Sequence, residues 1–569
     1  MDSNILNNSS EFALVEKRIR ALTTILAKMG HRQEPSFDLQ QVPSLLRHFV
    51  YLLTPGDVFS PEVKKAIAAT GAIVHDGVNE RFQTLMVTQN LYPRSSLTES
   101  KLEEVTKSRN QFKKSLPLLI IISNNDVPLN EHISEIWTAL ASYEPSTDNY
   151  IALSRFVINC CRRKLFTRIF LYQKTWHVHV AQKLADWTPA ANELPETHWL
   201  DAPHWFSLIH LPPDKYVPKR KQGPPDNQVT QLEFSSNTVH LWASFLGHLI
   251  LTLESHAVEA QKMENEGDTL GFKTAMGKVS DYCAALYCFV SWGAGVVKTL
   301  LTKTTLASKF NGFTNGDDLY DSDESDDLNP EPHESSGRRV LRYLKGIVAW
   351  HAAISIAYDA DIFQITRSEL SLSLLEIPHA SFDIANLDDI YEAYFNVISL
   401  KPSIAYEDLT KPILKRHLPQ TFSGTVHAEA TLMSLLTYFS SSSSRVAFDM
   451  PLRDDHVAAL DKLLEPASLI INATTENVVA VGRKCCWCCD RLHFELLKAN
   501  GTQFKFPGSN GVIYPWSPPR VGVDVKVLQR LEDALFQELH AVISDQSDLL
   551  YRPSSGAYLH FSPLEVCGF

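Results

Sequence analysis

Apolar residues recur every three or four positions along most of the first 300 residues, which is the period of an amphipathic α-helix. In the clearest segment, residues 9–30, one face carries Val15, Ile19, Leu22, Leu26 and Met29. Ser9 or Ser10 can cap the start of this helix and Gly30 can end it. Other apolar runs lie at 118–122, 239–253 and 282–301. The pattern predicts a mostly helical N-terminal region over residues 1–314.

This periodicity stops at an acidic, Ser- and Pro-rich segment over residues 315–339. Between Asp317 and Glu334 it has nine acidic residues and no Lys or Arg. Such a segment cannot bury enough apolar surface to offset the entropy lost on ordering. We therefore expect a disordered loop or linker here. Helical periodicity resumes over residues 340–400.

Helical and strand-like patterns alternate beyond residue 400. Helices are expected at about 427–439, 487–499 and 525–544, and the strand-like segments are 477–482 and 504–519. This alternation is typical of an α/β domain. We place that domain at residues 401–548 and a C-terminal tail at 549–569.

The composition is that of a soluble globular protein, with 44% hydrophobic and 21% charged residues among 569. The most membrane-like stretch, residues 282–297, has 16 uncharged residues, whereas a spanning helix needs roughly 20. It is interpreted as a buried core helix. The N-terminus lacks a basic start followed by an apolar core, so no secretory signal is expected. We expect an intracellular protein, cytoplasmic or nuclear, without a membrane partner.

The net charge of −12 gives little support for strong nucleic-acid binding. The acidic segment accounts for most of it, and residues 401–569 have 16 Lys and Arg against 18 Asp and Glu. A domain that binds nucleic acid strongly usually has a basic surface. The nearest candidate patch consists of Arg162, Arg163, Lys164 and Arg168.

Four of the nine cysteines lie in one short stretch, VAVGRKCCWCCDRL, over residues 479–492. Cys485, Cys486, Cys488 and Cys489 could form a metal site, a redox pair, a disulfide knot or an accidental buried cluster. In an intracellular protein disulfides are improbable. The helix that follows favours thiolates at its N-terminus.

The face of that helix selects one pair of cysteines. Cys489 continues into an apolar stripe, whereas Cys488 continues into a charged face. We therefore expect Cys486 and Cys489 to point inward, Cys488 to point outward, and Cys485 to lie in the loop. Two thiolates do not complete a zinc site, because a catalytic zinc usually has three protein ligands.

A candidate third ligand begins another apolar helix, in TVHAEATLMSLLTYF. His427 opens this helix, and Glu429 lies on its apolar face, where an unpartnered carboxylate is costly and is a candidate for proton transfer. His-x-Glu followed by Cys-x-x-Cys is the pattern of zinc deaminases. In that pattern zinc activates water, and the glutamate moves protons.

Three segments resemble the fungal OTT-like deaminases, a branch of the cytidine-deaminase-like superfamily. They are VHAEATLMSLL, VVAVGRKCCWCCDRL and FPGSNGVIYPWSPP, in the family's order. The resemblance implies a three-layer α/β/α fold with Zn²⁺ held by His427, Cys486 and Cys489, and with Glu429 as the catalytic residue. Two features depart from the superfamily: Cys485 stands where Pro is common, and 59 residues separate His427 from Cys486.

These observations predict a zinc-dependent hydrolytic deaminase that acts on a nucleobase in a nucleoside, nucleotide or nucleic acid. Tyr514 and Trp516 are candidates for stacking on the base, and Arg483 and Lys484 for contacting a phosphate. Ordinary packing and a solvated loop are the competing interpretations of these four residues. The competing functions are an inactive deaminase-fold interaction protein stabilised by zinc, and a thiol oxidoreductase.

Overall fold

The computed structural model describes most of the chain. The described residues are 3–34, 36, 44–54, 67–76, 79–90, 101–104, 129–141, 147–176, 178–190, 193–194, 196–201, 220–222, 230–292, 294–311, 335–359, 371–377, 383–398, 404–440, 477–482, 484–519 and 522–551. Most of the predicted acidic linker, the apolar run at 118–122 and the segment 441–476 lie outside these residues.

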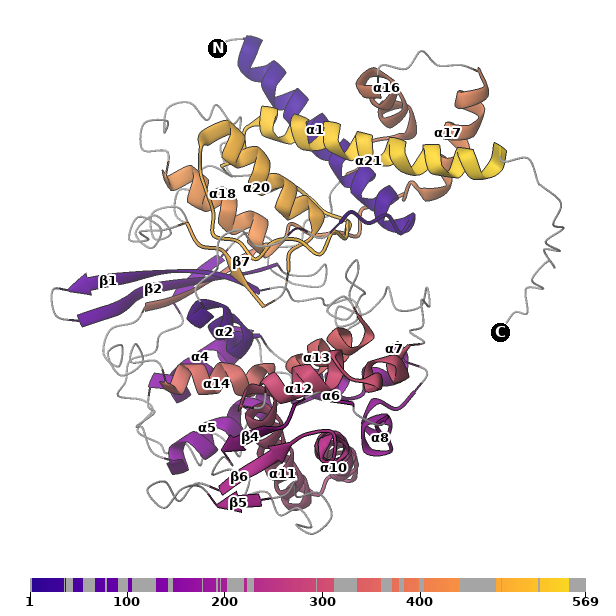
Figure 1. The fold of residues 1–569 in the computed structure, drawn as a ribbon. Helices are drawn as coiled ribbons and strands as arrows, with labels where there is room; N and C mark the ends of the chain where they lie inside the picture. Colours follow the sequence, from indigo (N-terminus) through magenta and orange to yellow (C-terminus); the bar gives the residue numbers. More distant parts are fainter. Residues whose placement is uncertain are drawn as a thin grey trace.

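A five-stranded mixed sheet lies between two groups of helices (Figure 1). Its strands are β1 (Ile67–Asp76), β2 (Asn79–Asn90), β3 (Lys101–Glu104), β7 (Ser371–Ile377) and β8 (Ala480–Val481). They lie in the order β3-β7-β2-β1-β8. The β2–β7 pair is parallel and the other neighbouring pairs are antiparallel. The sheet therefore joins three widely separated parts of the chain.

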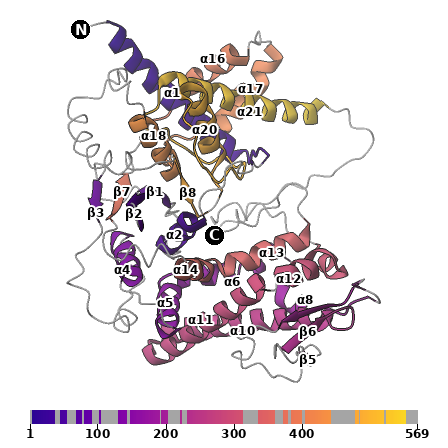
Figure 2. The same cartoon turned by 60° about the vertical axis from the view of Figure 1, so that its left-hand side comes forward.

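The helices on one side of this sheet come from the middle of the chain, apart from α2 near the N-terminus (Figures 1 and 2). They are α2 (Ser44–Leu53), α4 (Leu129–Ala141), α5 (Thr147–Cys160), α6 (Arg162–Ile169), α7 (Tyr172–Thr175), α8 (Val180–Ala185), α10 (Val239–Glu266), α11 (Thr269–Trp292), α12 (Ala294–Thr302), α13 (Ser336–Ile347) and α14 (Ala349–Asp359), with the short 3₁₀ helix η3 (Thr305–Phe310). A small antiparallel sheet, β4-β6-β5, accompanies them; its strands are β4 (His198–Asp201), β5 (Arg220–Gln222) and β6 (Thr230–Phe234).

The helices on the other side come from both ends of the chain (Figure 1). They are α1 (Ser3–Lys28), α16 (Leu387–Ile398), α17 (Ile404–His417), α18 (Ala428–Ser440), α20 (Trp487–Asn500) and α21 (Val525–Tyr551). Helix α1 packs against α21, and α18 contacts β1 and β2. Helix α2 contacts β1 and β8 from the opposite side (Figure 2).

The sheet separates two hydrophobic cores because successive side chains of a strand point to opposite faces. In β1, Ile67 and Ala69 belong to the core of the middle helices, whereas Ala68 belongs to the core of α1, α18, α20 and α21. Around β8, Val479 and Val481 likewise face the second core, and Ala480 the first. Both faces are buried, which explains why residues 477–482 are almost continuously apolar.

The observed elements differ from the sequence expectations in several places. The region expected to be helical up to residue 314 contains the strands β1 to β6, and residues 340–400 contain β7. Helix α13 begins at Ser336, so residues 336–339 belong to a helix and not to a linker. Residues 504–519 form isolated β-bridges and no strand.

The described residues are mostly helical, with strands in two small sheets. The second core contains α1 from the predicted N-terminal region together with α18, α20 and α21. This core therefore draws on both sides of the boundary expected at residue 400.

The membrane-like stretch at 282–297 is divided between α11 and α12 and contributes Leu286, Phe289 and Val297 to the first core. Among the described residues, no single helix has both the length and the apolar composition for a membrane span. Two bent helix pairs, Thr269–Ser291 with Gly295–Thr302 and Ser336–Ile347 with Ala349–Ala357, satisfy those criteria together.

Candidate metal centre

His427 stands immediately before α18 (Ala428–Ser440), at the position that caps a helix. Its carbonyl oxygen accepts a hydrogen bond from the Thr431 N–H, at 3.1 Å, which begins the helical pattern. The apolar residues that follow anchor α18 in the second core. The imidazole is therefore carried at the N-terminal end of a buried helix.

Cys486 caps the second helix of the site, α20 (Trp487–Asn500). Its Sγ accepts a hydrogen bond from the Cys489 backbone N–H at 3.4 Å. An N-cap side chain that satisfies a free backbone N–H is a usual way to start a helix. The three-residue spacing places Cys489 over the same helix start. Both cysteines therefore lie where the helix dipole favours a thiolate.

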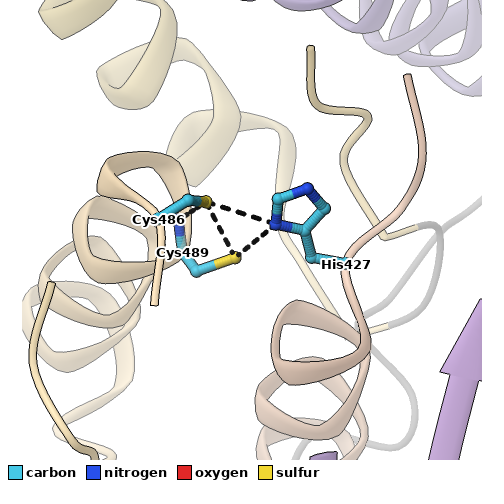
Figure 3. A group of neighbouring side chains, drawn as sticks. All are labelled: His427, Cys486 and Cys489. Atoms are coloured by element: carbon cyan, nitrogen blue, oxygen red, sulfur yellow. Dashed lines mark hydrogen bonds between the residues drawn. The ribbon is translucent and has the colours of Figure 1, made fainter. Parts of the chain in front are cut away.

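These two helix ends bring three side chains together (Figure 3). His427 Nδ1 lies 3.3 Å from Cys486 Sγ and 3.5 Å from Cys489 Sγ, and the two sulfurs are 3.4 Å apart. Cys486 and Cys489 are buried and His427 is half-buried. These three residues form a group that can hold a metal ion. The pair selected from the sequence is thus the pair that faces the histidine.

Glu429 lies beside the same group, in the first turn of α18. It is 6% exposed, and its Oε1 is 3.7 Å from His427 Nδ1, the nitrogen that faces both sulfurs. A buried carboxylate therefore lies next to the position that a metal ion would occupy. The two residues on either side of Glu429, Ala428 and Ala430, are fully buried.

The thiols of the cluster differ in their ease of ionisation. Burial would raise the pKa of Cys486, but hydrogen bonds from Cys488 and Cys489 and the charge of His427 outweigh it, so its pKa lies well below the usual value. Burial and the neighbouring Cys486 raise the pKa of Cys488 and of Cys489 well above the usual value. Cys486 is therefore the first of these thiols to become a thiolate.

Cys488 does not point outward as the helix pattern predicted. It is fully buried in the second core, and its side chain hydrogen-bonds to that of Cys486. The prediction failed because it assumed that the face of α20 with Arg491 and Glu495 is solvated, whereas Glu495 is fully buried and Arg491 is half-buried. Cys485 precedes the helix and is also buried, at 2% exposure. All eight cysteines of the described residues are free, so no disulfide knot forms there.

Residues 508–517, here called the bridging segment, connect the two halves of the site through backbone hydrogen bonds. At the cysteine side, Cys485 N–H donates to Gly508 O and Trp487 N–H donates to Val512 O, both at 2.9 Å. At the histidine side, Ser517 N–H donates to Thr425 O at 2.9 Å. The segment therefore fixes the separation of His427 from the cysteines.

The four predicted substrate-binding residues differ in their burial and in their distance from the site. Trp516 is fully buried and belongs to the second core, which favours the competing interpretation of ordinary packing. Tyr514 is half-buried, and its ring centroid lies 6.3 Å from that of His427. Lys484 is half-buried next to Cys485, and Arg483 lies outside the described residues.

Asp490 is an acidic residue near the site that sequence reasoning missed. Burial raises the pKa of its carboxyl to about 6, although a hydrogen bond from Ser36 opposes the shift and Cys486 adds to it. Its position in the first turn of α20 was visible in the sequence. Its link to residue 36 was not, because more than 450 residues separate the two.

The predicted basic patch is only partly at the surface. Arg162 is 5% exposed and pairs with Glu264 at 2.8 Å. Arg168 is 7% exposed, donates to Gly346 O and lies over the Trp350 ring. These two arginines stabilise the packing of the middle helices, whereas Arg163 and Lys164, the other two members of the candidate patch, are half-buried.

Comparisons of the chain with protein-family models, with curated proteins and with solved structures find no match.

Proposed function

We propose that this protein is a zinc-dependent hydrolytic deaminase of a nucleobase, with its active site at His427, Cys486, Cys489 and Glu429. The observation that carries the proposal is the convergence of one imidazole nitrogen and two sulfurs within 3.5 Å, with a buried carboxylate beside them. The order of these residues along the chain is that of the zinc-deaminase pattern. A cytidine-deaminase-like α/β/α arrangement would use the sheet together with helices on both of its faces.

The donor set suits zinc. A tetrahedral zinc ion holds two thiolate sulfurs about 3.8 Å apart, and a sulfur and an imidazole nitrogen about 3.5 Å apart, given bonds of about 2.3 and 2.0 Å. The corresponding separations here are 3.4 Å between the sulfurs and 3.3 and 3.5 Å from sulfur to nitrogen. Two sulfurs and one nitrogen also match the soft and borderline ligands that zinc prefers.

Three protein ligands leave one coordination position, where zinc would lower the pKa of a water molecule. Glu429 is the group of the chain that can move protons there. In hydrolytic deamination, the oxygen of water replaces the exocyclic amino group, and ammonia leaves. The Glu429 carboxylate would accept a proton from water and deliver it to the ring nitrogen beside the reacting carbon. The second proton of water would then reach the amine, so that it departs as ammonia.

The substrate class follows from this chemistry. The reaction requires an amino group on an amidine-like ring carbon, as in cytosine or adenine. Tyr514, half-buried beside His427, is the remaining aromatic candidate to contact the ring. Because Arg162 and Arg168 are buried, free bases, nucleosides and nucleotides are the first substrates to test, followed by single-stranded oligonucleotides.

The test is ammonia release from such a panel by wild-type protein and by Glu429→Gln, each assayed for zinc in parallel. Gln has the shape of Glu but cannot carry a proton, so we expect the variant to keep zinc and to lose at least about a hundredfold in turnover.

A matched control is Glu259→Gln, which removes a carboxylate that lies beside His256 on α10, on the other side of the sheet from the site. It should keep wild-type activity. Turnover by Glu429→Gln equal to that of the wild type would refute the assignment of Glu429. Zinc-loaded wild-type protein without activity on the whole panel would favour a non-catalytic zinc-stabilised interaction protein.

A further inference from the structure

The first helix of the chain contacts the bridging segment with side chains that the sequence did not single out. Trp516 N–H donates to Thr23 Oγ1 at 3.1 Å, and the Thr23 hydroxyl lies 3.2 Å from Trp516 O. Arg20 Nε donates to Ser517 Oγ at 2.9 Å. Thr23, Arg20 and Ser517 are all at most 3% exposed. These are buried polar contacts between parts of the chain almost 500 residues apart.

The residues after α1 contact the other half of the bridging segment. Gln33 N–H donates to Gly511 O at 2.9 Å, and Ser509 N–H donates to Ser36 Oγ at 2.7 Å. Arg32 forms an isolated antiparallel bridge with Val512. The N-terminal residues 20–36 therefore follow the bridging segment along most of its length.

These contacts lie next to the hydrogen bonds that join the bridging segment to the segments carrying the metal ligands. Thr23 bonds to the backbone of Trp516, and the next residue, Ser517, bonds to Thr425, two residues before His427. Gln33 bonds to Gly511, and the next residue, Val512, accepts the hydrogen bond from Trp487, which follows Cys486. Each N-terminal contact is thus at most one residue away from a contact that holds a ligand-bearing segment.

We infer that the N-terminal helix is part of the metal centre, and that Thr23 and Arg20 are positioning residues that hold His427 at its distance from Cys486 and Cys489. This inference rests on the metal centre of the proposed function. Metal sites depend on such outer contacts, whose loss commonly weakens metal binding 10- to 100-fold. Thr23 does not contact the metal ligands, and it positions His427 through the backbone of residues 516, 517 and 425.

The test is the zinc affinity of the full chain, measured by competition with a chromophoric chelator, together with the visible spectrum of the Co²⁺-substituted protein. Thr23→Val keeps the shape of the side chain but removes the acceptor of the Trp516 N–H. We expect at least a tenfold weaker zinc affinity and an altered Co²⁺ spectrum, and we expect Thr23→Ser, which keeps the hydroxyl, to restore both.

The matched control is Thr24→Val. Thr24 is 2% exposed, and its hydroxyl donates to Arg20 O within α1, at 2.7 Å. This variant loses a buried helix hydrogen bond of the same kind but leaves the contact with the bridging segment intact, so zinc affinity should stay within about twofold of the wild type. Ser517→Ala breaks the Arg20 contact from the other side. It should also weaken zinc binding, which keeps the inference testable if Thr23→Val does not fold.

The outcomes separate this inference from the proposed function. Wild-type affinity in Thr23→Val and Ser517→Ala, or equal losses in Thr23→Val and Thr24→Val, would overturn the positioning role and leave the metal centre standing. Wild-type protein that binds no zinc would overturn the metal centre itself.

Discussion

At the scale of single residues, Glu254 is a buried carboxyl group whose protonation should control stability. It lies on α10 in the first core, is 7% exposed, and its Oε1 has no hydrogen-bond partner among the described residues. Its Oε2 is 3.1 Å from His179 Nε2, which in turn is 2.9 Å from the Tyr172 hydroxyl. Burial raises the pKa of Glu254 from 4.5 to about 7 and lowers that of His179.

This shift predicts a specific pH dependence. The folded protein keeps the Glu254 proton up to about pH 7, whereas the unfolded chain releases it near pH 4.5. Between these values the folded state binds more protons, so its free energy of unfolding falls as the pH rises. Glu254→Gln lacks this titration. Urea unfolding from pH 4.5 to 8 should therefore show the variant gaining stability relative to the wild type, by at most about 1.4 kcal/mol per pH unit.

The control for this prediction is Glu266→Gln, which removes an exposed carboxylate from the C-terminal end of the same helix. Its stability should follow the wild-type pH curve. A constant difference between Glu254→Gln and wild type across this range would show that Glu254 titrates normally in the folded protein. His179 contacts Glu254, so the difference between the two proteins reports the titration of this pair of groups.

At the scale of elements, the residues that follow α1 and the bridging segment approach each other too closely for a side chain. Gly511 has φ of +75°, and a Cβ there would lie 2.0 Å from Gln33 O. Gly501, which ends α20, has a similar φ of +67° but open space around the position of its Cβ. Substitution of Gly501 therefore measures the cost of backbone strain alone, and substitution of Gly511 adds the cost of a steric clash.

Ala substitutions at these glycines should differ in their effect on stability. Gly501→Ala should lower the free energy of unfolding by about 1 kcal/mol, the cost of a left-handed backbone with a Cβ. Gly511→Ala should lower it by about 2 kcal/mol more, because the Gln33 backbone must move as well. Urea unfolding of metal-free proteins measures both. Equal losses would show that residues 32–34 do not pack against the bridging segment.

Local patterns in the sequence predicted some elements closely and missed others. Helix α20 was placed within one residue of its observed end, because Cys486 caps it and Gly501 ends it, and both signals are local. Strands β1 and β2 pair with each other as a local hairpin, and they were missed because the helical pattern was extended over the whole N-terminal region. Both strands also have distant partners. Strand β2 pairs with β7, almost 290 residues later, and β1 pairs with β8, more than 400 residues later.

In the candidate site, too, features with a local sequence signal were predicted and features that depend on distant segments were missed. The spacing of Cys486 and Cys489 at a helix start made their pairing predictable, and the geometry agrees with it. The burial of Cys488 was not predictable from the local pattern, since it depends on how the second core encloses the site, whereas the burial of Trp516 agrees with the competing packing interpretation. The role of Thr23 had no local signal at all, because a buried threonine in a helix usually bonds only within that helix.

At the scale of the whole molecule, the sheet divides the protein into two cores that share its strands. The core of the metal centre combines the first helix of the chain with the last described one, α21. The Arg18–Glu532 ion pair joins the two helices, and His31, which follows α1, lies 2.8 Å from Glu538. A C-terminal fragment that begins near residue 400 would expose the α1-facing side of this core. The full chain is therefore the appropriate protein for every metal-binding experiment.

The most direct test of the metal centre is the zinc content of freshly purified, reduced full-length protein, measured by atomic emission for wild type, Cys486→Ala and Cys485→Ala. We predict about one zinc ion per chain in the wild type, none in Cys486→Ala, and about one in Cys485→Ala, which keeps the backbone hydrogen bonds of residue 485 to the bridging segment. Wild-type protein without zinc, or loss of zinc from both variants alike, would contradict a centre built from His427, Cys486 and Cys489.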